Sequence, residues 1–259
     1  MDRRVRCHAT QSDRMNGKMT AAYLGHVLLC TALLVGTNCG HAPQHNESGV
    51  VQHSLIFGGS DYQYFLSKPA TSDGTNALPV LFLVHGSGGD GLDFIQFWRD
   101  LANQNGIILL APTFRFGADL EKQVPELFRA LVEDAKKYSR IDPRRVYLFG
   151  YSAGGYCTFD AATLDSTYFT AAAVFAGIIT PDYDGIVQQA RRKTPIAMYI
   201  GDHDQFFSLA ETRRTRDLLL VNGFPVHYVE IAHQDHNYGA ISATVNEDAW
   251  TFMSKFALP

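Results

Sequence analysis

The chain has 259 residues, of which 46% are hydrophobic, 12% aromatic and 19% charged. This composition excludes a disordered, collagen-like or disulfide-scaffold protein and allows one sizeable buried core. The 22 Lys and Arg residues against 26 Asp and Glu residues give a formal net charge of −4, and basic residues cluster only at the extreme N-terminus, so binding to nucleic acid is not expected.

The beginning of the chain has the pattern of an export signal. Basic residues precede an apolar run over 21–35, and a small, polar stretch follows at 36–40. The run has about fifteen residues, fewer than the roughly 20 that span a bilayer as a helix, which favours a cleaved signal peptide over 1–39 rather than a retained membrane anchor. A later start of the chain, at Met15 or Met19, is the remaining alternative.

The cysteines bear on where the protein works. Cys39 stands where a bacterial lipoprotein carries its lipidated cysteine, although Asn38 is a poor residue before such a cleavage. Cys157 is the one cysteine beyond this leader, so an exported domain would have no internal disulfide and would depend on core packing. We expect a periplasmic or secreted protein that meets a membrane only through a lipid on Cys39.

From residue 50 onward, β-branched or aromatic runs alternate with segments of helical period. That alternation predicts an α/β fold, a mostly parallel sheet with helices on both faces. Eight strands are expected, at 51–57, 62–66, 80–85, 107–111, 145–149, 172–175, 196–200 and 226–231. No helix separates the first two, so they should form an antiparallel hairpin at one edge. No linker or repeat divides 50–259, which predicts a single catalytic domain there.

Helical periodicity is clearest over 121–138. Its apolar residues recur at spacings of three and four, so that one stripe faces a sheet. The stripe consists of Val124, Leu127, Leu131, Ala135 and Tyr138. Pro125 would then lie in the first turn, where its missing N–H costs little. Helices are also expected at 209–220 and at 240–256, the second of which would close the domain.

The most specific motif is Gly150-Tyr151-Ser152-Ala153-Gly154, between an apolar strand and an Ala-rich helical segment. This is the context of a nucleophile elbow, a sharp strand-to-helix turn in which flanking glycines prevent clashes and the central serine adopts strained backbone angles. Ser152 is therefore the candidate nucleophile. A tight turn that merely prefers small residues is the alternative, but it does not explain the strand before, the helix after and the partners found downstream.

A serine nucleophile needs a base, and the base needs a partner that fixes its tautomer. In a sheet of this kind the acid comes next in the chain and the histidine comes last. The loop after the seventh strand carries Asp202 and Asp204. We favour Asp204, which lies further out, where it can turn toward Ser152, and expect Asp202 to hydrogen-bond loop amides. Asp182 and Asp184 are a distant third choice.

The loop after the last strand supplies the candidate base. His236 stands directly before the terminal helix and is favoured over His233, which would otherwise be a solvated loop residue. His203 and His227 are interpreted as ordinary loop and strand residues. Two histidines and an aspartate close together also fit a metal site, but the sequence has no companion ligands with zinc-like spacing. No metal or other cofactor is expected.

The oxyanion intermediate of acyl transfer needs two backbone donors. One should be the amide of Ala153, and the other should come from the loop after the third strand, most simply from Ser87 in His85-Gly86-Ser87-Gly88-Gly89. A phosphate cradle is the rival interpretation of this glycine-rich loop. The loop lacks both a G-K-[ST] ending and a G-x-G-x-x-G register, which argues against it.

Together these motifs resemble the α/β-hydrolase superfamily. The likeness extends over nearly all of the predicted domain and is carried by 85–89, 141–147, 150–155, 201–204 and 235–238. Within the superfamily the chain is similar to secreted poly(3-hydroxybutyrate) depolymerases and feruloyl-esterase-like esterases. The resemblance implies a Ser152, Asp204, His236 triad that cleaves carboxylic esters through an acyl-enzyme, with the Ser87 and Ala153 amides as oxyanion donors.

The expected substrate is a small acyl, aryl or hydroxyalkanoate ester. Phe114, Phe206 and Tyr238 lie on loops at the predicted active face and are candidates for lining its pocket, with core or loop packing as the alternative for each. A serine peptidase of the prolyl-oligopeptidase type would use the same mechanism, but the sequence shows no gating domain. A non-catalytic binding protein on this fold would usually lack the serine or the histidine, and both are present.

Overall fold

The computed structural model describes residues 49–259 except 118–119 and 121–122. The described residues all belong to one unit of the chain, His45–Pro259. The predicted signal peptide and Cys39 lie outside the described residues. Within the described part of the chain, no helix is long and apolar enough to cross a membrane.

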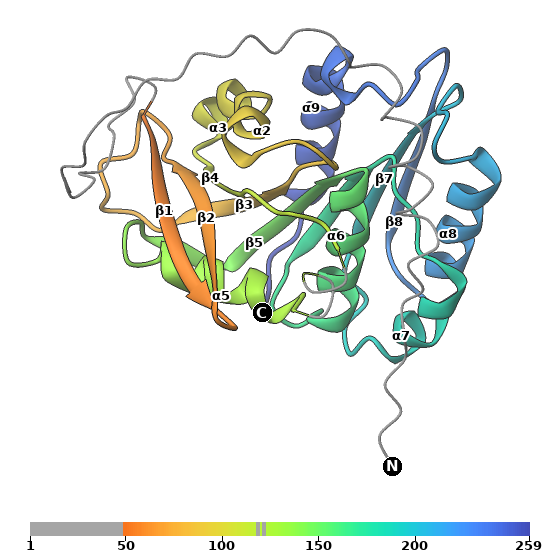
Figure 1. Cartoon of the computed structure of the whole chain (residues 1–259), viewed down its shortest axis with the longest axis horizontal. Helices are drawn as coiled ribbons and strands as arrows, with labels where there is room; N and C mark the ends of the chain where they lie inside the picture. The colour runs from red at the N-terminus through yellow and green to blue at the C-terminus, as the bar shows by residue number, and fades with distance from the viewer. Residues whose placement is uncertain (1–48, 118–119, 121–122) are drawn as a thin grey trace, which may run out of the picture. The chain divides into compact units, whose positions relative to one another are not determined.

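An eight-stranded sheet runs through the structure in the order β1-β2-β4-β3-β5-β6-β7-β8 (Figure 1). The strands are β1 (Val50–Phe57), β2 (Ser60–Ser67), β3 (Leu78–Val84), β4 (Ile108–Pro112), β5 (Ile141–Tyr151), β6 (Ala171–Phe175), β7 (Ile196–Gly201) and β8 (Val226–Ile231). Strand β2 pairs antiparallel with β1 and β4, and every other pair is parallel. The predicted mostly parallel sheet and its edge hairpin are confirmed.

Helices cover both faces of this sheet, which explains why the central strands are apolar on both sides. In β3, Val80 and Phe82 face one hydrophobic core while Leu81 and Leu83 face the other. The first core lies under α5 (Glu126–Ala135), α6 (Ala153–Leu164), α7 (Asp184–Gln189) and α8 (Leu209–Val221). The second lies under α2 (Gly91–Gln96), α3 (Arg99–Asn105) and α9 (Ser242–Met253). Short 3₁₀ turns occupy Pro181–Tyr183 and Tyr238–Ala240.

The helix predicted at 121–138 needs correction. Helix α5 begins only after Pro125, which takes the N-cap position instead of the first turn, and it ends at Ala135. Beyond that point Lys137 donates its backbone N–H to the residue three positions earlier, as in a tighter 3₁₀ turn, and Tyr138 turns outward with 46% of its surface exposed. The apolar spacing therefore continued one turn beyond the helix. The helices expected at 209–220 and 240–256 are present as α8 and as a shorter α9.

Candidate active site

Strand β5 and helix α6 form the sharp turn that carries Ser152. This residue is the N-cap of α6 and has φ 54° and ψ −118°, a backbone conformation that residues with a side chain rarely adopt. The turn closes only because its flanking residues are glycines. A Cβ at Gly150 would lie 2.2 Å from Thr158 Oγ1, and one at Gly154 would lie 2.3 Å from the carbonyl oxygen of Val84. The motif is thus required by close packing, and it fixes Ser152 at the carboxyl end of β5.

His236 lies between Ser152 and Asp204. Its Nε2 is 2.9 Å from Ser152 Oγ, and its Nδ1 is 2.7 Å from Asp204 Oδ2. None of the Asp204 side chain and only 12% of the His236 side chain is exposed. A carboxylate at Nδ1 favours the tautomer that carries its hydrogen there, which leaves Nε2 as an acceptor for the serine hydroxyl. The structure thus brings these three residues into one hydrogen-bonded chain.

The acid is held in its charged form by its surroundings. Burial opposes ionisation of Asp204, but hydrogen bonds from His236 and from the backbone amides of Phe207 and Phe206 outweigh it and lower the pKa of the carboxyl. Both amides donate to Oδ1, at 2.9 Å and 2.8 Å, while Oδ2 faces the imidazole. Both carboxylate oxygens of Asp204 therefore accept hydrogen bonds.

We expect Asp204→Asn to lower the thermal stability of the protein more at neutral pH than in acid. A carboxyl whose folded-state pKa is lowered stabilises the fold above its unfolded pKa, about 3.9, and that contribution is lost as the pH falls through the folded pKa. The difference in Tm between wild type and Asp204→Asn should thus be largest near pH 7 and should narrow below pH ~4. Unfolding curves at several pH values measure this difference in Tm. Asp202→Asn is the control, because it removes another carboxylate from the same loop. A difference that stays constant with pH would contradict the assignment.

The alternative acids and base lie outside this chain of hydrogen bonds. Asp202 Oδ1 accepts the backbone N–H of His233 at 2.7 Å, which ties the acid loop to the histidine loop. The exposed ring of His233 lies 5.6 Å from that of His203. Asp184 forms an ion pair with Arg214 at 2.6 Å. Among the described residues, none of these groups forms a hydrogen bond with Ser152, and Asp202 accepts a loop amide as expected.

His85 orients the glycine-rich loop, a role that was not predicted because it depends on a contact with Phe114, 29 residues further along the chain. Its Nε2 lies 2.9 Å from the backbone N–H of Phe114 and accepts it, so Nδ1 carries the hydrogen and donates to the Gly86 carbonyl at 2.7 Å. Burial lowers the pKa of His85, which keeps the ring neutral, as these two bonds require. In the trans peptide that follows, the Ser87 N–H points opposite to the Gly86 carbonyl, and hence away from His85.

Both segments expected to supply oxyanion donors adjoin Ser152. Ala153 is the first residue of α6, and the first N–H groups of a helix have no partner within the helix. On the other side, a Cβ placed on Gly86 would lie 3.3 Å from Ser152 Cβ. The peptide that joins Gly86 to Ser87 is therefore beside Ser152.

Of the three aromatic residues expected to line a pocket, only Phe206 is exposed beside His236. It has 50% of its surface exposed, and its ring centre lies 4.7 Å from that of His236. Phe114 is 4% exposed and stacks on Phe128 with ring centres 5.5 Å apart. Tyr238 is 2% exposed within the other core. The predicted pocket role of Phe114 and Tyr238 is therefore wrong, because neighbouring side chains cover both rings, and the packing alternative applies.

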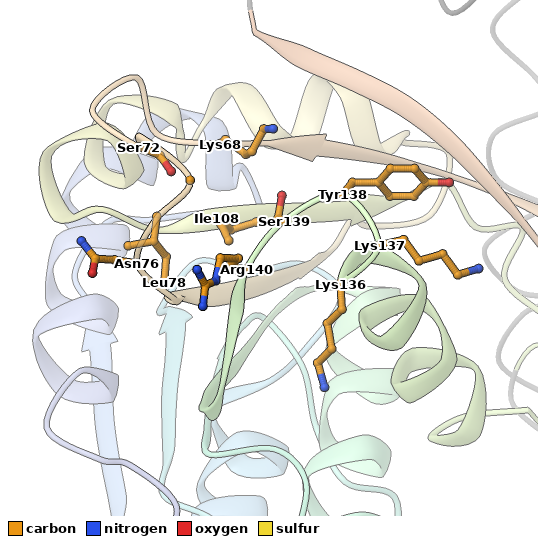
Figure 2. Close-up of a pocket in the computed structure, with 11 residues that line it drawn as sticks. Lys68, Ser72, Asn76, Leu78, Ile108, Lys136, Lys137, Tyr138, Ser139 and Arg140 are labelled. Carbon is orange, nitrogen blue, oxygen red and sulfur yellow. The ribbon is translucent and has the colours of Figure 1, made fainter.

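A hollow of about 240 Å³ lies at the other end of the sheet, near the start of β3 and β4 (Figure 2). Its lining includes the basic residues Lys68, Lys136, Lys137 and Arg140. Lys136 and Lys137 are engaged by acidic residues three positions earlier in α5, and in Figure 2 the two side chains point away from each other. The hollow shares no residue with the Ser152 site. In the described part of the chain, no group of three or more His, Cys, Asp or Glu side chains is arranged to hold a metal ion.

Comparison with known proteins adds a family and several structural neighbours. The model of the dienelactone hydrolase family matches residues 110–256. A thermostable esterase superposes with a TM-score of 0.64 at 20% identity, over 81% of this chain and 63% of that one. A ferulic acid esterase from Anaeromyces mucronatus, in complex with ferulic acid, gives 0.65 at 14% identity, over 86% and 98%. A candidate dipeptidyl aminopeptidase IV from Bacteroides ovatus gives 0.69 at 15% identity, over 80% and 36%. The search of curated proteins found no match.

These comparisons differ in what they establish. The chain spans 63% of the thermostable esterase and 36% of the aminopeptidase, and at such identities the solved structures show the fold alone. That fold is the α/β-hydrolase fold predicted from the sequence, and the superfamily that the motifs resemble is confirmed by the family match. The family match covers more than half of the chain and includes Ser152, Asp204 and His236. This chain therefore belongs to the dienelactone hydrolase family.

Proposed function

We propose that this protein is a carboxylic ester hydrolase that cleaves its substrate through a covalent acyl-enzyme on Ser152. The hydrogen-bonded chain from Ser152 Oγ through His236 to Asp204 carries this proposal. As Oγ attacks the carbonyl carbon, His236 Nε2 takes its proton, and the Asp204 carboxylate stabilises the imidazolium that forms. The imidazolium then gives that proton to the leaving alcohol. A water molecule, deprotonated by the same imidazole, attacks the acyl-enzyme and releases the acid and the free serine.

The negative charge that develops on the substrate oxygen would be held by the backbone amides of Ala153 and Ser87. The position of Ala153 at the start of α6 supports the first assignment. The second is supported by the His85 hydrogen bond that fixes the Gly86 carbonyl and so directs the Ser87 N–H the other way. Donors whose orientation is set before substrate binds need no reorganisation as the charge develops, which is the main source of their catalytic effect.

The substrate class that this site fits is an ester with a small acyl or aryl group. Phe206 presents half of its surface next to His236, and Phe207, which is buried, packs behind the imidazole with ring centres 5.8 Å apart. A rigid aromatic surface beside the reacting atoms favours a planar or short apolar group over a charged one. A hydroxyalkanoate ester is a further substrate of this class.

Phe206→Ala should weaken turnover of aryl esters selectively. Aromatic pairs contribute about 0.5–1.5 kcal/mol beyond area burial, so kcat/KM for methyl ferulate should fall about twofold to tenfold. Methyl butyrate, which has the same alcohol and no ring, should change less. Tyr138→Ala removes an aromatic side chain of similar exposure from the far end of the sheet and is the matched control. Equal losses for both esters in Phe206→Ala would contradict an aryl-binding role.

A substrate panel tests the proposed function directly. It should contain p-nitrophenyl acetate, methyl ferulate, a 3-hydroxybutyrate oligomer and a peptide p-nitroanilide, each with and without a fluorophosphonate inhibitor. Inhibitor-sensitive ester turnover with the adduct on Ser152 would support the proposal. Turnover of the peptide amide alone would favour a peptidase, the alternative raised by the aminopeptidase neighbour, and no turnover with no adduct would favour a binding protein.

We also propose that the enzyme is exported and works in the periplasm or outside the cell. Support comes from the sequence of 1–39, in which basic residues precede a short apolar run. The mass of the protein isolated from its native host tests this proposal. Loss of the leader, with or without acyl chains on Cys39, would support export, and an uncleaved chain in the cytoplasm would contradict it.

A further inference from the structure

We propose that Tyr151, the residue before the nucleophile, is a positioning residue that holds the backbone of His236 in register with Ser152. The inference rests on the proposed function, since it concerns the geometry in which His236 acts as base. A nucleophile elbow places steric demands on Gly150 and Gly154, and neither demand fixes the residue between Gly150 and Ser152. The identity of that residue therefore needs a separate explanation.

The first contact of Tyr151 is with the base. Its hydroxyl donates to the backbone carbonyl oxygen of His236 at 2.8 Å, and the two ring centres are 5.1 Å apart. The imidazole is already held at its two nitrogens by Asp204 and Ser152. The Tyr151 hydroxyl adds a third hydrogen bond to this residue, to the backbone of His236. Because Tyr151 and Ser152 are neighbours in the chain, this bond links the backbone of the nucleophile to the backbone of the base.

The second contact of Tyr151 is with the glycine-rich loop 85–89. A Cβ placed on Gly86 would lie 2.9 Å from both Cδ1 and Cε1 of Tyr151, so the main chain of Gly86 rests directly against the tyrosine ring. The next peptide carries the Ser87 N–H, and His85 holds its carbonyl oxygen. The ring of Tyr151 thus contacts His236 on one side and the glycine-rich loop on another.

The ring itself is well held. It lies in an aromatic cluster of the second core, with ring centres 6.3 Å from Phe94, 6.0 Å from Phe175 and 5.5 Å from Tyr238. Burial, with the negative charges of Asp204 and Asp235, raises the pKa of Tyr151 to about 12. The hydroxyl therefore stays protonated and remains a donor across neutral and moderately alkaline pH. Because the ring is fixed and its hydroxyl always donates, Tyr151 can hold the backbone of His236 in one position.

Tyr147 offers a matched control within the same strand. It lies four residues earlier in β5, faces the same core, and donates its hydroxyl to a backbone carbonyl oxygen, that of Phe256, at 2.7 Å. Burial raises its pKa to about 12 as well. Its partner is at the C-terminal end of the chain and not in the triad loops. Tyr147→Phe therefore removes a hydrogen bond of the same kind without touching His236.

The experiment compares Tyr151→Phe with Tyr147→Phe. Each variant loses one neutral hydrogen bond, so both should unfold at a somewhat lower Tm. Only Tyr151→Phe should lower kcat for p-nitrophenyl acetate, by about threefold to tenfold, with KM within about twofold of wild type. The rate of fluorophosphonate labelling of Ser152 should fall by the same factor, because that reaction needs the same base. Amide hydrogen exchange in the loop 232–237 should become faster in Tyr151→Phe alone.

Two results would overturn the proposal. One is a Tyr151→Phe enzyme with the wild-type kcat and labelling rate and a Tm loss like that of Tyr147→Phe, which would make the tyrosine a packing residue. The other is an equal loss of kcat in both variants, which would indicate a global effect. Failure of the proposed function looks different, since the wild type would then lack inhibitor-sensitive ester turnover. In that case hydrogen exchange still tests whether Tyr151 anchors the loop.

Discussion

Replacement of Ser152 by alanine should reduce ester turnover by at least about 10⁴-fold and leave the fold intact, because loss of a triad serine removes covalent catalysis and leaves only the oxyanion donors and substrate binding. The side chain is small and lies at a turn whose closure depends on Gly150 and Gly154, so its hydroxyl has no part in forming the elbow. The measurement is kcat/KM for p-nitrophenyl acetate, accompanied by circular dichroism and a thermal melt.

A second alanine variant separates this effect from a general loss of hydroxyl groups. Ser54→Ala changes an exposed position on the edge strand β1, far along the sheet order from β5, and should retain wild-type turnover. A folded Ser152→Ala protein that turns over ester at the wild-type rate would contradict the nucleophile assignment. Such a result would move the search to another nucleophile in the same site.

The central strands β3, β4, β6 and β7 were predictable because each is a continuous apolar run buried on two sides by helices. The ends of the strands were less predictable, because strand ends depend on pairing with the neighbouring strand. Strand β5 begins at Ile141, well before the expected 145, since Ile141 pairs with Leu78 of β3. Helices α2, α3 and α7 have six or seven residues. Fewer than two turns give no clear apolar period, so the sequence did not indicate them.

The choice between neighbouring candidates in the site depended on different kinds of information. Asp204 and Asp202 lie on one short loop, and Asp204 was preferred because it lies further out, where it can turn toward Ser152. The structure shows what separates them. Asp204 is covered and accepts two loop amides beside the imidazole, while Asp202 accepts the N–H of His233. The bonds from Asp202 to His233 and from Asp204 to His236 join segments about thirty residues apart, so they leave no local pattern in the sequence.

Burial of single aromatic residues was the least predictable feature. Phe114 and Phe206 both lie on loops that follow strands, yet Phe128 of α5 covers the first while the second stays exposed. The difference arises from packing between distant elements. His85 and Tyr151 were missed as positioning residues for a related reason. Their signals were weak but present: a histidine directly after a buried strand and before a glycine-rich run, and a bulky polar residue at an elbow position where sterics do not require glycine.

The second large effect is expected at the base. His236→Ala should lose at least about 10⁴-fold in kcat, comparable with the loss of the nucleophile, because the two residues act as a unit. His233→Ala, three residues earlier on the same loop, should retain near-wild-type turnover, since its ring is exposed and faces His203. The pair therefore compares loss of an imidazole inside and outside the hydrogen-bonded chain, with the loop otherwise the same.

Chemical rescue makes this comparison sharper. The cavity left in His236→Ala would lie between Ser152 Oγ and Asp204 Oδ2, which the native imidazole joins with contacts of 2.9 Å and 2.7 Å. Imidazole added to the solution can occupy that cavity, take the serine proton and be held by the same carboxylate. Part of the lost activity should return in His236→Ala, and none should return in Ser152→Ala, where the nucleophile itself is missing. If His233→Ala were instead the inactive and rescuable variant, the role of base would pass to His233.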